Sequence, residues 1–242
     1  MDWDTYAEQY RQLDYKTGIP PLLAGVLSAS SGSLLDMGCG EGALLDRIRN
    51  RYPDSWEMMG FEVSEIRAGI AAARGHSILV DPAGVVPAPA GSFDLVISSH
   101  VIEHVPDDRD YACQLARLTR PGGHVYLETP VRLRGGWYFR RNEKAGWVLD
   151  PTHVREYRSA DAATAALRAA GLDVVSFHLA QIAFPIAAAE ALVRRAARLG
   201  PPQLTASGLR AKEVPIPRYR EIGVLCRRPA PAAPDGNVQP IR

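Results

Sequence analysis

The segment from Leu34 to Ala43 constrains the fold more than any other part of the chain. It begins with a short apolar run that predicts a buried strand, continues through three closely spaced glycines, and leads into apolar residues at helical spacing. Glycine allows a tight turn and a close approach of the backbone to a ligand. A strand that passes through such a turn into a helix is typical of a nucleotide-binding site.

Strands and helices are predicted to alternate on both sides of this turn. Apolar runs bounded by turn residues predict strands at 33–37, 56–63, 77–80, 93–98 and 124–128. Helical spacing and capping residues predict helices at 43–51, 64–74, 107–119 and 159–171. This alternation predicts an α/β fold in which helices cover both faces of a parallel sheet.

The pattern changes in the second half of the chain. Residues 131–157 are irregular, aromatic and basic, and so long a loop within a compact domain is usually functional or mobile. Two last strands are predicted at 172–179 and 219–227, separated by an apolar helical stretch and a proline-rich segment.

The predicted organisation is therefore a single domain over residues 1–228. Residues 130–158 and 181–217 are predicted to be insertions on the substrate side of this domain. Residues 229–242, rich in proline and alanine, are predicted to be a disordered tail.

Composition excludes several classes of protein. The net charge of +1 provides no general field for a nucleic acid, so no nucleic-acid partner is expected. Three widely spaced cysteines fit a reducing compartment. The amino terminus lacks the basic and apolar regions of a secretory signal, and the apolar stretch 179–193 is too short to span a bilayer. A cytoplasmic protein without a membrane partner is expected.

Two acidic residues restrict the ligand of the glycine turn. Gly38, Gly40 and Ala43 also fit a loose dinucleotide pattern, so a nicotinamide cofactor is one interpretation. Asp36, however, directly precedes the glycines, where a carboxylate suits an ammonium group and opposes a diphosphate. Glu62 lies about 20 residues further on, the position at which an acid binds ribose hydroxyls in either interpretation.

These residues, together with the segment from Phe93 to Val105, resemble the class I S-adenosylmethionine-dependent methyltransferases. The similarity extends from about Tyr6 to about Leu179 and includes the loop and strand from Leu118 to Leu127. The resemblance implies a Rossmann-like, doubly wound sheet of seven strands, mostly parallel, whose last strand is antiparallel. It also implies S-adenosyl-L-methionine as the cofactor.

The resemblance further implies roles for particular residues. The glycine loop would contact the methionine part of the cofactor, Glu62 the ribose and Asp81 the adenine amino group, while amino-terminal tyrosines would cover the ligand. Cys39 is expected to be a small packing residue. The candidate cofactor-binding residues are Tyr6, Tyr10, Asp36, Gly38, Cys39, Gly40, Glu62, Val63, Asp81, Pro82, Ser98, Ser99 and His104.

Methylation of an oxygen acceptor requires removal of a proton, for which histidine is well suited. His153 is the first candidate base, because it lies after the irregular segment and before a predicted helix. The alternative is that His153 only ties this segment to the core. His100 and His104 follow the fourth strand at the ligand-binding edge, but the family often carries a histidine at position 104 whatever its substrate. No metal site is predicted.

Cations and aromatic rings in the irregular segment suit an aromatic or anionic acceptor. A solvated loop with a few anchored rings is the alternative. The candidate acceptor-binding residues are Arg132, Trp137, Tyr138, Phe139, Arg140, Trp147, His153 and Tyr157. The helix predicted from Ile186 to Arg198 is expected to cover the pocket or to form a homodimer contact rather than to lie on a membrane.

The sequence thus predicts a methyltransferase that acts on an oxygen, or less readily a nitrogen, of a small molecule, with specialised metabolism as its setting. The alternatives are an RNA methyltransferase, a nicotinamide-dependent oxidoreductase and a binding module that has lost its acceptor site. An oxidoreductase would need a group at the hydride site that the sequence does not reveal.

Overall fold

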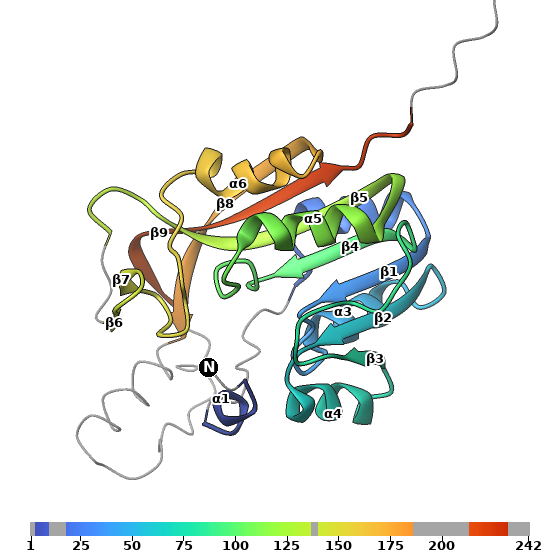
Figure 1. Cartoon of the computed structure of the whole chain (residues 1–242), viewed down its shortest axis with the longest axis horizontal. Helices are drawn as coiled ribbons and strands as arrows, with labels where there is room; N and C mark the ends of the chain where they lie inside the picture. The colour runs from blue at the N-terminus through green and yellow to red at the C-terminus, as the bar shows by residue number, and fades with distance from the viewer. Residues whose placement is uncertain (1–2, 10–17, 137–139, 186–212, 232–242) are drawn as a thin grey trace, which may run out of the picture.

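The computed structural model describes residues 3–9, 18–136, 140–185 and 213–231. Its main feature is a seven-stranded sheet with the strand order β3-β2-β1-β4-β5-β9-β8 (Figure 1). The strands are β1 (Gly32–Met37), β2 (Trp56–Glu62), β3 (Ser77–Val80), β4 (Phe93–Ser99), β5 (Thr119–Arg132), β8 (Asp173–Pro185) and β9 (Glu213–Arg227). The order reverses between β1 and β4, the kind of switch point at which open α/β sheets bind ligands.

The strand directions confirm the predicted fold. β1, β2, β3, β4 and β5 pair in parallel, whereas β9 runs antiparallel to both of its neighbours, β5 and β8. The sheet is therefore mostly parallel, with an antiparallel last strand.

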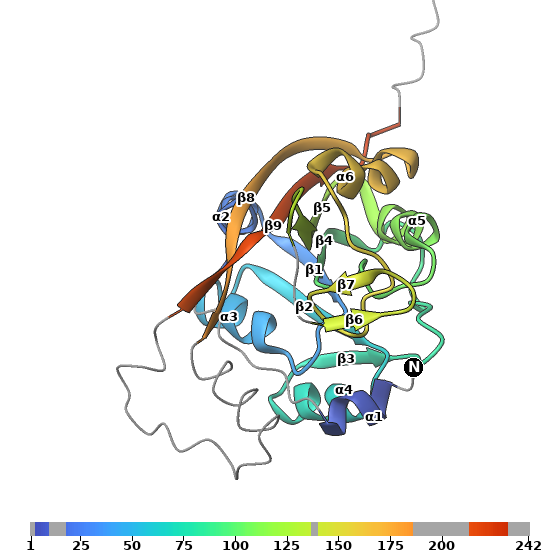
Figure 2. The same cartoon turned by 90° about the vertical axis from the view of Figure 1, so that its left-hand side faces the viewer.

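Helices cover both faces of the sheet (Figure 2). On one face, α2 (Pro21–Ala29) and α3 (Ala43–Arg51) bury leucines and isoleucines against β1 and β4. On the other face, α5 (Asp108–Leu118) and α6 (Ala160–Ala169) pack on β4, β5 and β9. Two further helices, α1 (Trp3–Gln9) and α4 (Glu65–Ala73), lie side by side near the free edge at β3.

Short polar side chains begin three of the helices, as the capping pattern predicts. The hydroxyl of Ser64 accepts a hydrogen bond from the amide of Arg67, and that of Ser159 accepts one from Ala162. Asp107 accepts two amide bonds at the start of α5. Each cap pairs backbone groups that a helix end would otherwise leave without a partner.

Several strands are longer than predicted. The fifth was predicted at 124–128, but β5 begins at Thr119 and includes Pro121-Gly122-Gly123, with a register shift against β4. It also continues to Arg132, because its last residues pair with β9. Both β8 and β9 reach into the predicted insertion 181–217.

The irregular segment contains a small hairpin that was not predicted, formed by β6 (Arg140–Asn142) and β7 (Gly146–Val148). The helix predicted at 186–198 and the tail beyond residue 231 lie outside the described residues. Among the helices that are described, none has the length and apolar character needed to cross a lipid bilayer.

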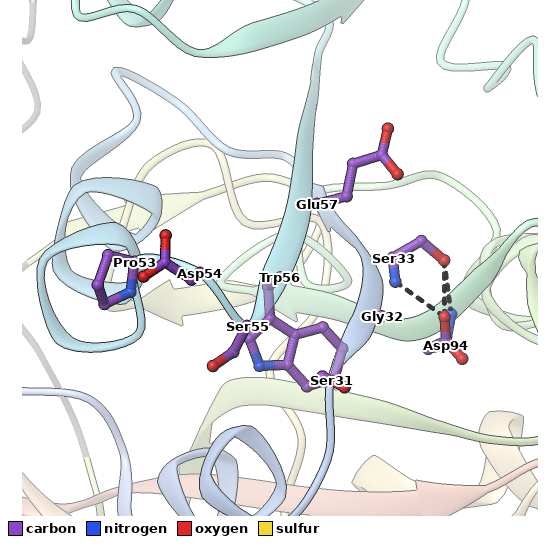
Figure 3. A pocket seen from close by; sticks show the side chains of 9 residues that line it. All are labelled: Ser31, Gly32, Ser33, Pro53, Asp54, Ser55, Trp56, Glu57 and Asp94. Carbon is purple, nitrogen blue, oxygen red and sulfur yellow. Dashed lines mark hydrogen bonds between the residues drawn. The ribbon is translucent and has the colours of Figure 1, made fainter.

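A depression at the amino-terminal ends of the strands has a structural explanation (Figure 3). It lies beside the starts of β1, β2 and β4, at the ends of these strands that are remote from the glycine turn. There Asp94 accepts hydrogen bonds from the amide and hydroxyl of Ser33 and forms an ion pair with Arg120. These contacts tie neighbouring strand ends together.

Candidate cofactor and acceptor site

The glycine turn is held against β2 by its own backbone. The amides of Gly38 and Cys39 both donate to the carbonyl oxygen of Phe61, at 2.8 and 3.0 Å. Gly38 has a φ of +89°, and a Cβ atom there would lie 2.3 Å from Cγ2 of Val101. Both the dihedral and the close approach require glycine at this position.

Two buried carboxylates flank the turn. Asp36, at the end of β1, is 2% exposed, and Glu62, at the end of β2, is 5% exposed. Burial and the nearby Glu62 raise the pKa of Asp36 to about 7, although Arg47 opposes this shift. A cation bound beside Asp36 would relieve the unfavourable burial of its charge, whereas a diphosphate would meet two carboxylates.

Glu62 also organises the turn. Its Oε2 accepts the amide of Gly40 at 2.8 Å, and its Oε1 accepts the amides of Val63 and Ser64 at 2.9 and 3.0 Å. A carboxylate offers about four acceptor positions, so three bonds leave capacity for a ligand hydroxyl. The residues around the turn therefore fit an amino-acid nucleoside such as S-adenosylmethionine.

Helix α1 connects the two sides of the site. The hydroxyl of Tyr6 donates to Oδ2 of Asp150 at 3.0 Å, and the guanidinium of Arg67 lies 5.2 Å from the centre of the Tyr6 ring. Asp4 accepts hydrogen bonds from the hydroxyl of Ser64 and the amide of Ile66 at the start of α4. Tyr10 lies outside the described residues.

Other predicted cofactor residues lie, like the glycine turn, at the carboxyl ends of the strands. The amide of Asp81 donates to the carbonyl oxygen of Glu62 at 3.4 Å, and the exposed Pro82 follows it. The hydroxyl of the buried Ser98 shares a 2.8 Å hydrogen bond with Tyr111, whereas that of Ser99 donates to Glu128. The two serines therefore face opposite sides of β4.

The structure brings His104 and His153 together, although they are distant in the sequence. The neighbouring contact between His104 and Thr152 joins residues 48 positions apart. The two ring centres are 4.7 Å apart in an edge-to-face arrangement, and the ring of Trp3 packs edge-to-face on His104 from 5.7 Å. His104 Nδ1 shares a 2.8 Å hydrogen bond with the hydroxyl of Thr152. Burial lowers the pKa of His104, and this effect outweighs the attraction of Glu103.

His100 lies between carboxylates. Its Nε2 is 2.7 Å from Oε2 of Glu221 and its Nδ1 is 3.3 Å from Oε1 of Glu103. The residue has a left-handed φ of +56°, and its amide donates to the carbonyl oxygen of Glu128. Although burial raises the pKa of Glu103, the hydrogen bond from His100 and the nearby imidazoles lower it to about 2.

The predicted acceptor residues occupy different environments. Arg132 is buried and donates to the carbonyl oxygen of Trp147, whose side chain is 46% exposed on β7. Tyr157 is buried, and its hydroxyl donates to Asp108 on α5 at 2.9 Å. Arg140 begins β6, and residues 137–139, which include Trp137, Tyr138 and Phe139, lie outside the described part of the chain.

Within the described part of the chain, two side-chain clusters have the composition of a metal site. Possible ligand atoms of Glu103, His104 and His153 all lie within 4.8 Å of one another, and the same is true of His100, Glu128 and Glu221. Imidazole and carboxylate groups at these separations can hold a divalent cation.

Sequence reasoning missed several contributors to the site. Glu156 lies three residues after His153, a local spacing that would have indicated their contact. Glu221 carried no such signal, because it reaches His100 across 121 residues through the pairing of β5 with β9.

Residues 6–177 match the family model described as a methyltransferase domain. This match covers more than half of the chain, which therefore belongs to the methyltransferase domain family. Together with the sheet topology, the match confirms the predicted membership of the class I S-adenosylmethionine-dependent methyltransferases.

Individual relatives share about a third of their residues with this chain over the aligned part. The chain is 31% identical over 155 residues to a ubiquinone biosynthesis O-methyltransferase of Cronobacter sakazakii, an alignment that covers 56% of this chain and 58% of that protein. It is 32% identical over 173 residues to the 27-O-demethylrifamycin SV methyltransferase of Amycolatopsis mediterranei, covering 65% of this chain and 60% of that protein. The matched region thus spans less than two thirds of the length of either relative.

A solved structure shares the fold at low sequence identity. The crystal structure of the [4+2]-cyclase SpnF superposes with a TM-score of 0.59, covering 87% of this chain and 80% of that chain at 18% identity. This similarity shows the architecture alone, because one fold can carry different chemistry.

Proposed function

We propose that this protein transfers a methyl group from S-adenosyl-L-methionine to an oxygen atom of a small-molecule acceptor. The observation that carries the proposal is the pair of buried carboxylates, Asp36 and Glu62, on either side of a glycine turn. Asp36 would bind the ammonium group of the cofactor, and Glu62 would bind its ribose hydroxyls.

The cofactor supplies a methyl group that is already activated by a positively charged sulfur, so the protein's main task is to position the acceptor. An oxygen acceptor also has to lose its proton. His153 is the proposed base, because it is buried beside His104 at the edge of the sheet where β4 ends. His100 is held by Glu103 and Glu221 and is assigned a supporting role.

The relatives suggest the type of acceptor. One relative is named a ubiquinone biosynthesis O-methyltransferase, and the other is named a 27-O-demethylrifamycin SV methyltransferase. We therefore propose a hydroxylated, largely apolar small molecule of specialised metabolism as the acceptor. A cytoplasmic location is supported by three cysteines that are not paired in disulfides. A homodimer remains a proposal from the sequence.

The proposal is tested first by cofactor binding. Isothermal titration calorimetry with S-adenosylhomocysteine should show one site per chain, and NADH should not bind. A panel of phenols and aliphatic alcohols, incubated with methyl-labelled S-adenosylmethionine, should then yield a labelled ether. Binding of NADH without binding of S-adenosylhomocysteine would contradict the proposal.

The second candidate is a chain that uses the same cofactor pocket without methyl transfer. It corresponds to the binding module without an acceptor site that the sequence leaves open as an alternative. Transfer of label to any acceptor would exclude this candidate.

A further inference from the structure

The side chain of His153 is held by a residue outside the predicted site. His153 Nδ1 lies 2.9 Å from Oε1 of Glu156, and the two side chains are only 4% and 1% exposed. Because burial strengthens the interaction between imidazole and carboxylate, this contact restricts the ring far more than a surface pair would.

The same carboxylate oxygen defines which nitrogen carries the proton. Oε1 of Glu156 also accepts the amide hydrogen of Leu149 at 2.8 Å. An ionised carboxylate carries no hydrogen and can only accept, so Nδ1 of His153 has to be the donor in this contact. In the neutral ring, Nε2 is then the nitrogen that can accept a proton.

The backbone of His153 is fixed as well. Its amide donates to the carbonyl oxygen of Asp150 at 3.1 Å, and its carbonyl oxygen accepts the side-chain amide of Asn142 at 2.6 Å. The next amide, that of Val154, donates to the carbonyl oxygen of Glu103 at 2.9 Å. The ring therefore has a defined position relative to the loop that follows β4.

Glu156 and a buried arginine both influence the buried hydroxyl of Tyr219. Arg132 on β5 is 5% exposed and is paired in register with Tyr219 on β9, which is fully buried. Burial and the charge of Glu156 raise the pKa of Tyr219, whereas Arg132 lowers it, which places both charges near the Tyr219 hydroxyl. Arg132 and Glu156 therefore act in opposite directions on the same buried hydroxyl.

We propose that Glu156 is a positioning residue that holds His153 in the Nδ1–H tautomer and thereby presents Nε2 as the base. This inference rests on the proposed function. In the reaction, the acceptor O–H proton moves to Nε2, the oxygen electron pair forms the bond to the methyl carbon, and the carbon–sulfur bond breaks with its electrons on sulfur. The products are a methyl ether, a neutral thioether and an imidazolium that later releases its proton.

The tautomer can be measured without knowledge of the acceptor. Full-length protein labelled with ¹⁵N-histidine would be studied by long-range ¹⁵N–¹H NMR in alkaline buffer, and the His153 signals would be assigned by their loss in His153→Asn. We expect a proton on Nδ1 and an unprotonated Nε2. The opposite tautomer in the unmodified protein would overturn the inference.

Two variants separate the hydrogen bond from the charge. Glu156→Leu removes the acceptor, and we expect His153 to shift toward the Nε2–H tautomer. Glu156→Gln keeps an acceptor oxygen and should retain the Nδ1–H tautomer, as should Glu143→Gln, which changes an exposed acid of the same segment. An unchanged tautomer in a folded Glu156→Leu protein would also overturn the inference.

Failure of this inference is distinguishable from failure of the proposed function. Binding of S-adenosylhomocysteine by both Glu156 variants would show that the cofactor site is intact whatever the tautomer. Once an acceptor is known, Glu156→Leu should lower kcat by about 100-fold or more with the KM for the cofactor unchanged. An unchanged kcat would overturn the assigned role.

Discussion

The amide of Gly40 donates a 2.8 Å hydrogen bond to the Glu62 carboxylate, although 22 residues separate them in the sequence. This bond joins the turn after β1 to the end of β2. Replacing Glu62 with alanine should weaken S-adenosylhomocysteine binding by at least tenfold, about 1.4 kcal/mol or more, because both a ligand contact and the support of the turn are lost.

Calorimetry measures this change directly, and Glu57→Ala is the matched control, since Glu57 is exposed on the same strand. Equal affinity in the Glu62 variant and the control would remove the ribose role assigned to Glu62.

Asp36 makes the stability of the ligand-free protein depend on pH. Its pKa rises from 3.8 to about 7 in the folded protein, so between these pH values the folded state holds a proton that the unfolded state has released. Stability that is present at low pH is therefore lost as the pH rises through this window. The contribution of Asp36 to the free energy of unfolding should fall by roughly 1.4 kcal/mol for each pH unit within it. His104, whose pKa is lowered by burial, acts in the opposite direction.

Urea unfolding at several pH values should show this loss as a pH-dependent difference in unfolding free energy between the unmodified protein and Asp36→Asn. The exposed Asp54→Asn should behave like the unmodified protein. Because an ammonium group favours ionised Asp36, saturating S-adenosylhomocysteine should also flatten the dependence. The same pH dependence in the unmodified protein and in Asp36→Asn would assign it to other groups.

Gly38 combines two constraints that a double variant can separate. Gly38→Ala should be destabilising, because its Cβ would meet Val101 and because the residue has a φ of +89°. Adding Val101→Ala relieves the contact but leaves the unfavourable dihedral, which costs about 1–2 kcal/mol. Thermal unfolding should therefore show partial recovery, and complete recovery would mean that the dihedral carries no cost.

Chelation distinguishes an unaided base from a metal site. If His153 removes the acceptor proton by itself, dialysis against EDTA should leave the rate of methyl transfer unchanged. The alternative result is that EDTA lowers the rate, that added divalent cations restore it, and that His104→Ala prevents this recovery. That result would assign a cation to the cluster of Glu103, His104 and His153.

Local patterns predicted much of the fold. Helix α3 has the predicted bounds, and Ser64 and Ser159 cap their helices, because these signals depend only on residues within about one turn. The extra residues of β5, β8 and β9 were missed, because partner strands distant in the sequence extend them.

The sequence by itself determined the strand, turn and helix around Gly38, the acids at both of its flanks and the order of elements, since apolar periodicity and glycine dihedrals act locally. Only the tertiary structure decided that Tyr6 reaches Asp150, that His104 meets His153 and that Glu221 holds His100. Those contacts join residues up to 144 positions apart. They arise from the packing of whole elements, which no short stretch of sequence encodes.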